Sequence, residues 1–271
     1  MPKTKEDVEK KPKLWGLQKK APFIQNLVLV ALYKDLGAKG YNQLSKDTRN
    51  WLGVSEKSLK HNSKILRCIM ARWAKAQILR GTKASWRKAA TAVPRPKWLA
   101  GVNLTMDSTD LPLEGRCSTS KKSELWSFKE NRPGTRYMVI FDLKNKVRGF
   151  WGPYSPKTYD AHWVLDHQDT LDTKWKGACI VGDCHFSLPK DTLENVKIIT
   201  PVPEPGKKQP KLSEVTKKRN AQIRQIHVHV ESPFGLWKGK WKALSQPWRE
   251  TPKQQGYVLN LAAGVHNFEM K

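Results

Sequence analysis

The sequence is poor in acidic residues. Its 271 residues include 24 Asp and Glu against 50 Lys and Arg, which gives a formal net charge of +26. Solubility does not need an excess this large, so the composition favours a polyanionic partner, with nucleic acid ahead of an anionic membrane surface. Long hydrophobic runs are also missing. The best stretch, FIQNLVLVALY, is about half of the 18 to 20 residues that a membrane span needs. We read it as a buried helix and expect no membrane partner.

Cysteine is scarce, and its spacing does not suggest a metal site. The four cysteines form no C-x-x-C pair, which argues against zinc and fits small buried side chains in a reducing compartment. The N-terminal stretch MPKTKEDVEKKPK is charged and has no apolar segment of the kind that directs secretion. We therefore expect a protein that is not secreted. It would lie in the nucleus of a eukaryote, or otherwise in the cytoplasm with the chromosome.

The basic charge is distributed unevenly along the chain. Residues 1–100 carry 23 basic and 6 acidic residues, whereas residues 101–271 carry 27 and 18. The change coincides with AVPRPKWLAG, whose two prolines and glycine interrupt a helical pattern before a strand pattern begins. This organisation predicts a basic flexible tail over 1–20, a helical DNA-binding domain over 21–95, an α/β domain over 96–250 and a helical C-terminal tail over 251–271.

The α/β domain is predicted from alternating strand and helix patterns. Strand candidates cover 103–113, 136–143, 147–154, 178–183 and 196–202. A helix is expected from Asp160, between the third and fourth of these strands, and a long amphipathic helix is expected from Leu212. Three strands, a helix, further strands and more helix predict one mixed sheet flanked by helices.

In the basic half, residues 53–77 read as one amphipathic helix. At 100° per residue the apolar side chains Leu59, Leu66, Met70 and Trp73 fall on one side, and the basic side chains Lys57, Lys60, Lys64, Arg67 and Lys75 fall on the other. Together with the preceding segment ending in RNWLG, this helix is interpreted as a helix-turn-helix whose basic face meets DNA phosphates. The alternative is an ordinary helix with a solvated basic face. The local excess of 12 basic residues over 1 acidic residue in 51–100 favours DNA.

Three acidic residues of the second half stand in or beside apolar runs. Asp107 lies in a strand candidate, Asp183 ends the strand ACIVGD, and Glu231 follows IRQIHVHV. An unpaired carboxylate in such a place is costly, and a divalent cation shared among the three would remove the penalty. Oxygen ligands without clustered Cys or His favour Mg²⁺ or Mn²⁺ over zinc. On a DNA-binding scaffold, a two-metal site of this kind activates a water or a 3′-hydroxyl against a phosphate.

Four motifs then carry a resemblance to a known family. They are MDSTDLPL, SELWSFKENRPGTRYMVIFDLKNKVRGFWGPYSPKTYDAHWV, VGDCHFSLP and VHVESPFGLWKGKWKAL. Their order resembles the DDE endonuclease domain of PIF/Harbinger-type transposases and their bacterial insertion-sequence relatives, over about residues 100–245. The resemblance implies an RNase H-like fold after a helix-turn-helix domain. It also implies a catalytic and metal-binding triad of Asp107, Asp183 and Glu231.

Neighbouring residues leave alternatives open. Asp110 is the rival of Asp107, although three residues apart in a strand means opposite faces unless a bulge intervenes. Asp160 matches a recurrent aspartate of the family, and we expect it to sit at a helix start, where a carboxylate suits the positive helix end. His185 follows the second aspartate where relatives often show Gly-Tyr. Its role is either a phosphate contact or, as we favour, part of the turn.

The segment around Glu231 makes further predictions. Pro233 would remove a helical hydrogen bond, so we expect a kink near 229–232, with Ser232 capping a new helix that starts at Pro233. Lys238 lies seven residues after Glu231, on nearly the same face, where its charge would hold DNA. Trp237 and Trp241 are expected to pack in the core rather than stack on bases.

The leading hypothesis is thus a metal-dependent DNA endonuclease and strand transferase acting in transposition, or a host protein derived from one. A non-catalytic DNA-binding protein that keeps the fold is the alternative. A basic RNA-binding protein would explain the charge but not the three acids. Since two DNA ends normally need two active sites, a homo-oligomer is expected. An accessory DNA-binding protein is a further expected partner.

Overall fold

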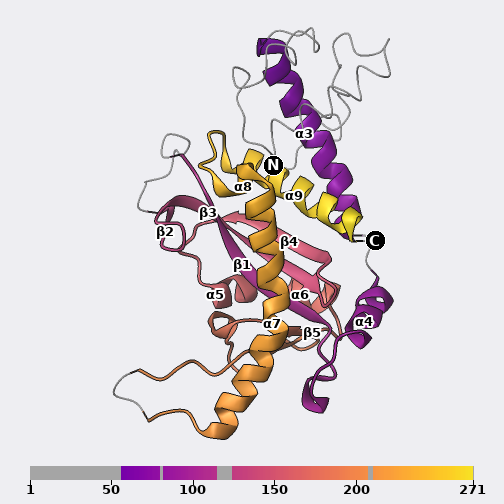
Figure 1. The fold of residues 1–271 in the computed structure, drawn as a ribbon, viewed down its shortest axis with the longest axis vertical. Coiled ribbons are helices and arrows are strands. Elements are labelled where there is room, and N and C mark those ends of the chain that lie inside the picture. The colour runs from indigo at the N-terminus through magenta and orange to yellow at the C-terminus, as the bar shows by residue number, and fades with distance from the viewer. Residues whose placement is uncertain (1–55, 80–81, 115–123, 207–209, 271) are drawn as a thin grey trace.

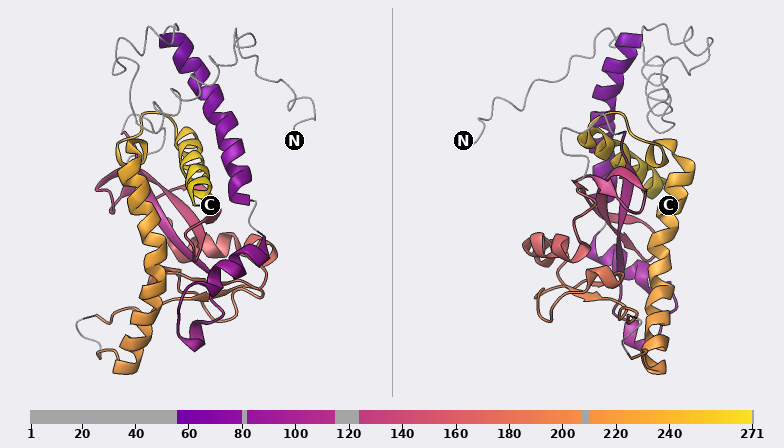
Figure 2. Two further views of the ribbon diagram at one scale, coloured as in Figure 1. Left: turned by 45° about the vertical axis from the view of Figure 1, so that its right-hand side comes forward. Right: turned by 90° about the vertical axis from the view of Figure 1, so that its left-hand side faces the viewer.

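The computed structural model describes residues 56–79, 82–114, 124–206 and 210–270. A mixed β-sheet lies between two layers of helices (Figure 1). In the right-hand view of Figure 2, the long helix α7 runs down one side of the sheet, and the shorter helices α5 and α6 lie on the other side. Helix α3 extends away from the sheet at one end. The expected mixed sheet flanked by helices is confirmed.

The sheet is built around its first strand. Strand β1 (Leu104–Pro112) pairs antiparallel with β3 (Arg132–Asp142) and parallel with β5 (Cys179–Val181). Strand β6 (Lys197–Ile199) extends the parallel side. On the other side, β2 (Trp126–Ser127) and β4 (Val147–Tyr154) both pair antiparallel with β3. Each strand candidate of the sequence therefore became a strand, and the short β2 was not foreseen.

The helices follow the predicted order. They are α3 (Glu56–Leu79), α4 (Lys83–Thr91), α5 (Asp160–Asp166), α6 (Gln168–Lys174), α7 (Glu214–Lys240), α8 (Lys242–Ser245) and α9 (Pro252–Glu269), with 3₁₀ turns η4 at Lys97–Leu99 and η5 at Cys184–Phe186. Side-chain caps fix the starts of α4, α7 and α9, where Thr82 is the cap of α4. Ser213 accepts the backbone N–H of Thr216 at the start of α7, and Thr251 does the same for Gln254 at the start of α9.

Alternation along the strands sends side chains into hydrophobic cores on both faces of the sheet. On the α7 side, Leu111, Val139 and Phe141 pack with residues of α7, α8 and α9, including the buried Trp237 and Trp241. On the α5 side, Met106, Met138 and Ile140 pack with Trp163, Val164 and Trp175, among others. Trp237 of α7 and Trp241, between α7 and α8, are thus core residues, as expected. Because successive side chains of a strand point to opposite faces of the sheet, consecutive residues of β1 lie in different environments.

Helix α7 corrects the prediction for Pro233. The helix runs without a break from Glu214 to Lys240, so no new helix starts at the proline. Ser232 does not cap a helix start, because its hydroxyl donates to the carbonyl of Val228, one turn back. Pro233 and Phe234 are buried against the sheet. Packing of this segment outweighs the lost backbone bond, which costs about 3 kcal/mol in a helix interior.

The described part of the basic half packs onto the sheet domain. Helix α3 lies along α9 and approaches it so closely at Ala74 that a side-chain carbon on Gly264 would sit 2.4 Å from the Ala74 methyl. Helix α4 joins the α5-side core, where Trp86 meets Trp175 with ring centroids 5.6 Å apart. Residues 21–55, which would supply the first helices of the expected helix-turn-helix, lie outside the described residues.

Two side chains of α3 point differently from the expectation. Arg67 was placed on the basic face, but it is only 2% exposed. Its guanidinium donates to Glu250 at 2.8 Å and lies 5.1 Å from the ring centre of Trp248. Trp73, expected on the apolar side, is exposed instead. The buried stripe consists of Leu66, Ala71, Ala74 and Ile78, because α9 approaches along small residues that allow close backbone contact.

Helix α9 is part of the core, because Val258, Leu259, Ala262 and Ala263 are buried in the α7-side core. Packing therefore continues past residue 250, where the α/β domain was expected to end. Within the described residues, no helix is long and apolar enough to cross a membrane.

Candidate active site

Two of the three predicted acids come from neighbouring parallel strands. Thr105 of β1 pairs with Val181 of β5, and Asp107 and Asp183 each stand two residues further on. Continued register therefore brings both carboxylates to the same edge of the sheet. Their proximity is visible in the electrostatics, because the charge of Asp183 contributes to raising the pKa of Asp107.

Asp107 is the most perturbed carboxyl of the site. Burial raises its pKa from 3.8 to about 6, while the positive charges of Lys129 and His227 act in the opposite direction. Its Oδ1 also accepts the backbone N–H of Ser108 at 2.6 Å. Since burial wins over these partners, the carboxylate carries an incompletely compensated charge at neutral pH. A group in this condition is a candidate ligand for a cation.

Asp183 is held by the turn that follows β5. Its Oδ1 accepts the backbone N–H of His185 at 2.8 Å, which caps the 3₁₀ turn η5. Phe186 is buried beneath this turn and approaches Gly182 so closely that a side-chain carbon there would meet the ring at 3.0 Å. His185 thus takes part in the turn through its backbone, and its side chain is exposed. A phosphate contact by its ring stays untested.

Glu231 reaches the same region from α7 through a histidine. Its Oε1 lies 3.5 Å from Nδ1 of His227, and Nε2 of that histidine lies 3.3 Å from the carbonyl oxygen of Met106, the residue before Asp107. The Glu231 side chain is 63% exposed. In the part of the chain that the structure describes, no three His, Cys, Asp or Glu side chains gather closely enough to hold a metal ion. The predicted triad is therefore not drawn together into a three-ligand cage.

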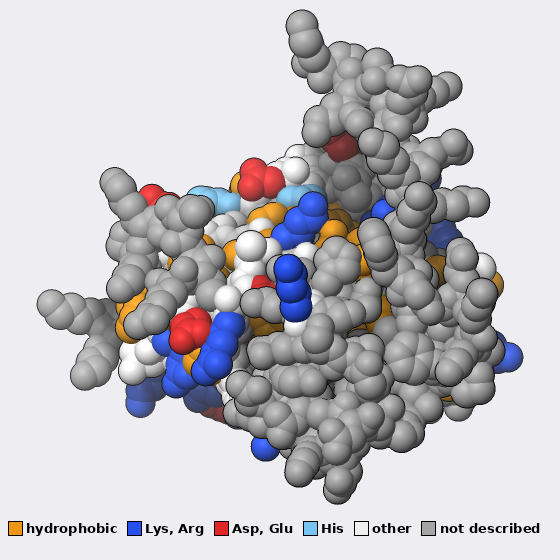
Figure 3. Space-filling model, turned by 90° about the horizontal axis from the view of Figure 1, so that it is seen from above, with side chains coloured by type: hydrophobic (Ala, Val, Ile, Leu, Met, Phe, Trp, Pro, Cys, Tyr) orange, Lys and Arg blue, Asp and Glu red, His pale blue; other side chains and the backbone are white. Residues whose placement is uncertain are grey.

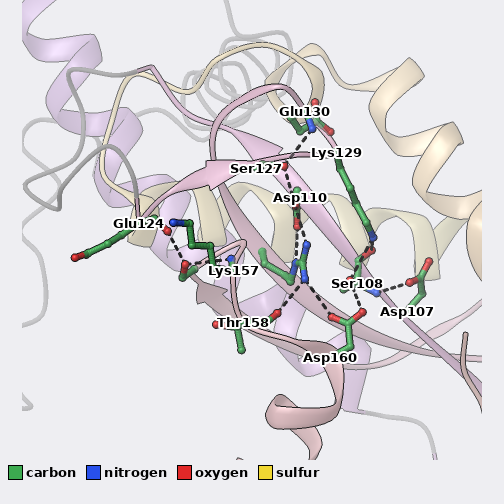
Figure 4. Close-up of polar contacts among 12 residues, drawn as sticks. Asp107, Ser108, Asp110, Glu124, Ser127, Lys129, Glu130, Lys157, Thr158 and Asp160 are labelled. Atoms are coloured by element: carbon green, nitrogen blue, oxygen red, sulfur yellow. Dashed lines mark hydrogen bonds and ion pairs between the residues drawn. The ribbon is translucent and has the colours of Figure 1, made fainter. Parts of the chain in front are cut away.

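Asp110 has a different environment from Asp107. Strand β1 pairs with β3 without a bulge from Leu104 to Pro112, so the two aspartates face opposite sides of the sheet. Asp110 is 1% exposed and lies directly across from Arg136, whose Nε and Nη2 donate to its two oxygens at 2.8 and 3.2 Å. Ser127 adds a bond at 2.7 Å (Figure 4). Asp110 is a fully compensated buried charge.

Asp160 begins α5, as the sequence predicted, and takes part in the same network. Its Oδ2 accepts the hydroxyl of Ser108 at 3.2 Å, and its Oδ1 lies 3.5 Å from Nη1 of Arg136. Burial raises the pKa of Asp160, Arg136 and Lys129 lower it, and Asp183 raises it further. The charge of Asp183 thus acts on both Asp107 and Asp160, although these two lie on opposite faces of the sheet.

Lys129 is a site residue that sequence reasoning missed. It lies in the turn between β2 and β3, and its Nζ reaches the carbonyl oxygen and the hydroxyl of Ser108 at 3.4 and 3.5 Å (Figure 4). Its charge lowers the pKa of both Asp107 and Asp160. Arg136 was missed in the same way. Neither position carries a motif that predicts the contact, because it depends on how β2 and β3 fold over β1.

The candidate DNA-binding residues differ in exposure and in pairing. Lys57 and Lys75 are exposed on α3, as expected, whereas the side chains of Lys60 and Lys64 lie outside the described residues. Lys238 pairs with Glu130 at 2.6 Å, so its charge is already partnered. Figure 3 shows Lys and Arg side chains across the described part of one face, beside apolar side chains.

This geometry defines an α/β protein with two acidic side chains at one edge of a mixed sheet, contributed by the central strand and its parallel neighbour. The model of the DDE superfamily endonucleases matches residues 106–267, a stretch that contains all three predicted acids. The chain belongs to this family, which indicates a transposase-type nuclease. No curated protein and no solved structure shows significant similarity to the chain.

Proposed function

We propose that the protein is a metal-dependent DNA endonuclease and strand transferase of the PIF/Harbinger type, acting in DNA transposition. Asp107, Asp183 and Glu231 are its catalytic and metal-binding residues in this proposal. The observation that carries it is the convergence of Asp107 and Asp183 from adjacent parallel strands with a carboxylate charge left uncompensated. Membership of the DDE superfamily endonucleases supports the reaction type.

The strand order supports an RNase H-like fold. The sheet has the order β2, β3, β1, β5, β6, and β4 also pairs with β3. Strand β3 runs antiparallel to β1, β2 and β4, whereas β1, β5 and β6 are parallel. The first acid stands on the central strand, the second follows the neighbouring parallel strand, and the third lies on the helix after the last strand. The resemblance of the sequence motifs implies the same positions for the triad.

The residues fit a hard divalent cation in their chemistry. The donors are carboxylate oxygens, which Mg²⁺ and Mn²⁺ prefer, and the raised pKa of Asp107 shows that its negative charge lacks a sufficient partner. Glu231 would have to turn from His227 to join Asp107 and Asp183. When bound, a pair of such ions activates the attacking oxygen and stabilises the leaving oxygen of a phosphodiester.

The chain's own residues prepare this site in three ways. The backbone N–H groups of Ser108 and His185 orient the carboxylates of Asp107 and Asp183. Lys129 holds a positive charge over β1, where it would meet a DNA phosphate. His227 contacts both Glu231 and the carbonyl of Met106, so it joins α7 to β1 beside Asp107.

The remaining expectations complete the proposal. The helix-turn-helix over residues 21–95 would bind transposon DNA, with Lys57, Lys60, Lys64 and Lys75 as phosphate contacts. The protein would act as a homo-oligomer, with or without an accessory DNA-binding protein. It would work where the chromosome is, in the nucleus of a eukaryote. The excess of 50 basic over 24 acidic residues supports the DNA partner.

Nicking of supercoiled plasmid in Mg²⁺ tests the proposal. We expect the wild type to nick the plasmid, and Asp183→Asn to lose nicking while keeping its affinity for DNA. Asp169→Asn is the matched control, because Asp169 is an exposed aspartate in the first turn of α6, and it should nick like the wild type. If wild type and Asp183→Asn both bind tightly and neither nicks, the protein is a DNA-binding scaffold and the enzymatic proposal is wrong.

A further inference from the structure

Two aromatic side chains near the acidic site are unusually exposed. Phe128, in the turn between β2 and β3, is 85% exposed, and Tyr159, just before α5, is 69% exposed. Among the described residues, no ring contact holds Phe128. Tyr159 meets one neighbouring ring, His162, edge to face at 5.6 Å. Exposing aromatic surface of this size gives up the free energy that its burial would supply, so a partner that covers it is expected.

Both rings flank the same buried ion pair. The residue before Phe128, Ser127, donates its hydroxyl to Asp110, and the residue before Tyr159, Thr158, accepts a bond from Arg136 through its carbonyl. Asp110 and Arg136 are themselves paired. In Figure 4, Ser127 and Lys129 lie above this pair, and Thr158 and Asp160 lie below it, with Asp107 to one side. The two aromatic residues therefore stand on opposite rims of this ion pair, on the face of the sheet that carries Asp160. Lys129, next to Phe128, lies near enough to Asp107 for its charge to lower the pKa of that carboxyl as well as that of Asp160.

The two rims are tied together and carry the same pair of residue types. Ser155 donates to the carbonyl of Glu124 at 2.6 Å, which links the turn before α5 to the segment before β2. Lys129 follows Phe128 directly, and the exposed Lys157 precedes Tyr159 by two residues. An aromatic ring next to a lysine is the combination that binds single-stranded nucleic acid, since the ring stacks on a base and the ammonium meets the phosphate.

We propose that Phe128 and Tyr159 stack on unpaired nucleobases of the DNA strand that enters the acidic site. This inference rests on the proposed function, because it takes DNA as the substrate. An unpaired strand is favoured over duplex, since the base faces inside a duplex are already covered by their neighbours and leave no surface for an exposed ring. The site would therefore prefer a frayed end, an overhang or a base that has left the stack.

The test compares two DNA hairpins that differ in their bases and share every phosphate. One carries a short 3′ overhang of ordinary nucleotides, and the other carries the same overhang with abasic sugars. Binding is measured by fluorescence anisotropy with EDTA present, so that no cleavage contributes. We expect the wild type to prefer the overhang with bases by about 100-fold, the effect of two stacked bases at about tenfold each. Phe128→Ala and Tyr159→Ala should each reduce this preference to about tenfold, because one ring still stacks.

Matched variants separate stacking from simple apolar contact and from misfolding. Phe128→Leu keeps an apolar side chain without a ring face. It should lower the preference for the overhang with bases as much as Phe128→Ala does. Phe268→Ala removes a 52% exposed phenylalanine from the end of α9 and should keep the preference. Unchanged affinity of every variant for the abasic hairpin shows that the fold and the phosphate contacts are intact. Equal binding of both hairpins by the wild type, or an undiminished preference in Phe128→Ala and Tyr159→Ala, overturns the inference.

The outcome is independent of plasmid nicking. A protein that nicks DNA but does not distinguish the two hairpins keeps the proposed function and loses this inference. A protein that distinguishes them through Phe128 and Tyr159 but does not nick keeps the base-stacking surface and loses the enzymatic proposal.

Discussion

Asp107 and Asp110 lie three residues apart on β1, and the fold treats their carboxylates in opposite ways. Asp110 receives two bonds from Arg136 and one from Ser127, which together compensate its charge away from solvent. Asp107 faces α7 and has a pKa raised to about 6. The comparison separates two uses of the same residue type. A compensated aspartate supports the sheet, and an uncompensated one is available to a ligand.

The same contrast occurs among the cations of α3. Arg67 is buried against Glu250 and Trp248, whereas Lys57 is exposed. Helical periodicity placed both on one basic face, and the packing of α9 separated them. The presence of a charged side chain is therefore a weak sign of function. A better sign is whether the folded protein already supplies an oppositely charged partner for it.

Removal of Arg136 should have the largest effect on stability. Arg136→Met leaves Asp110 buried without its cation, and breaking such a pair costs about 3–5 kcal/mol of unfolding free energy. Urea denaturation followed by circular dichroism measures it. The control is Arg249→Met, which removes a partner of Glu114 from an exposed pair and should cost less than about 1 kcal/mol. Equal losses in the two variants would show that Asp110 does not need its partner.

Neutralising each aspartate in turn tests the comparison directly. Asp107→Asn should lower the rate of plasmid nicking by about 100-fold or more without loss of stability, since it removes a preorganised charge from the reacting centre. Asp110→Asn should lower stability, because Arg136 is then left without its carboxylate. Nicking rates and urea midpoints of the two variants are the measurements. If Asp110→Asn lost nicking but kept the stability of the wild type, Asp110 rather than Asp107 would be the catalytic residue of β1.

The raised pKa of Asp107 predicts a pH dependence of stability. The folded state holds the Asp107 proton more tightly than the unfolded state, so the contribution of this group is present below pH 4 and is lost as pH rises through about 6. In EDTA at pH 7, Asp107→Asn should therefore have a melting temperature a few degrees above that of the wild type. This corresponds to a gain in unfolding free energy on the order of 1 kcal/mol. The difference should vanish near pH 4. Lys129, His227 and Asp183 surround the carboxyl and are unchanged in the comparison.

Mg²⁺ offers the corresponding ligand test. It should raise the melting temperature of the wild type at pH 7 and have no such effect on Asp107→Asn. Equal shifts in the two proteins would place Mg²⁺ binding elsewhere.

The smallest effect is expected on α3, where the contrast concerns Lys57 and Arg67. Replacing Lys57, Lys60 and Lys64 together with Ala should weaken DNA binding and flatten its dependence on log salt by about three units at most. Stability should not change, unlike in Arg67→Ala, which removes a buried cation from Glu250. Binding isotherms at several salt concentrations give the slope. An unchanged slope would assign the three lysines to an ordinary solvated surface.

Much of the fold was accessible from the sequence because strands and helices left periodic patterns. The strands around Asp107 and Asp183 were bounded by turns, and the helix start at Asp160 was marked by its carboxylate. The opposite facing of Asp107 and Asp110 followed from the period of two in a strand. The match to the DDE superfamily endonucleases confirms the DDE endonuclease domain that the motifs suggested, and the PIF/Harbinger type stays a prediction.

What the sequence did not reveal depends on contacts between distant segments. The pairing of Arg136 with Asp110 requires the register of β1 on β3, and the reach of Lys129 requires the turn after β2. The burial of Arg67 depends on Trp248, Glu250 and Gln254, more than 180 residues away in the chain. Pro233 was overestimated as a helix breaker, since local propensity does not include the apolar surface that Phe234 and Trp237 bury.

The close approach of Ala74 to Gly264 has a mechanical consequence. Glu56, at the other end of α3, is about 27 Å from that contact along the helix axis. A rotation of α3 by about 10° at this point would displace Glu56 by about 5 Å, given the rise per residue of a helix. Gly264 is thus the point about which α3 would turn. A bulkier residue at position 264 would change the direction in which α3 leaves the sheet domain.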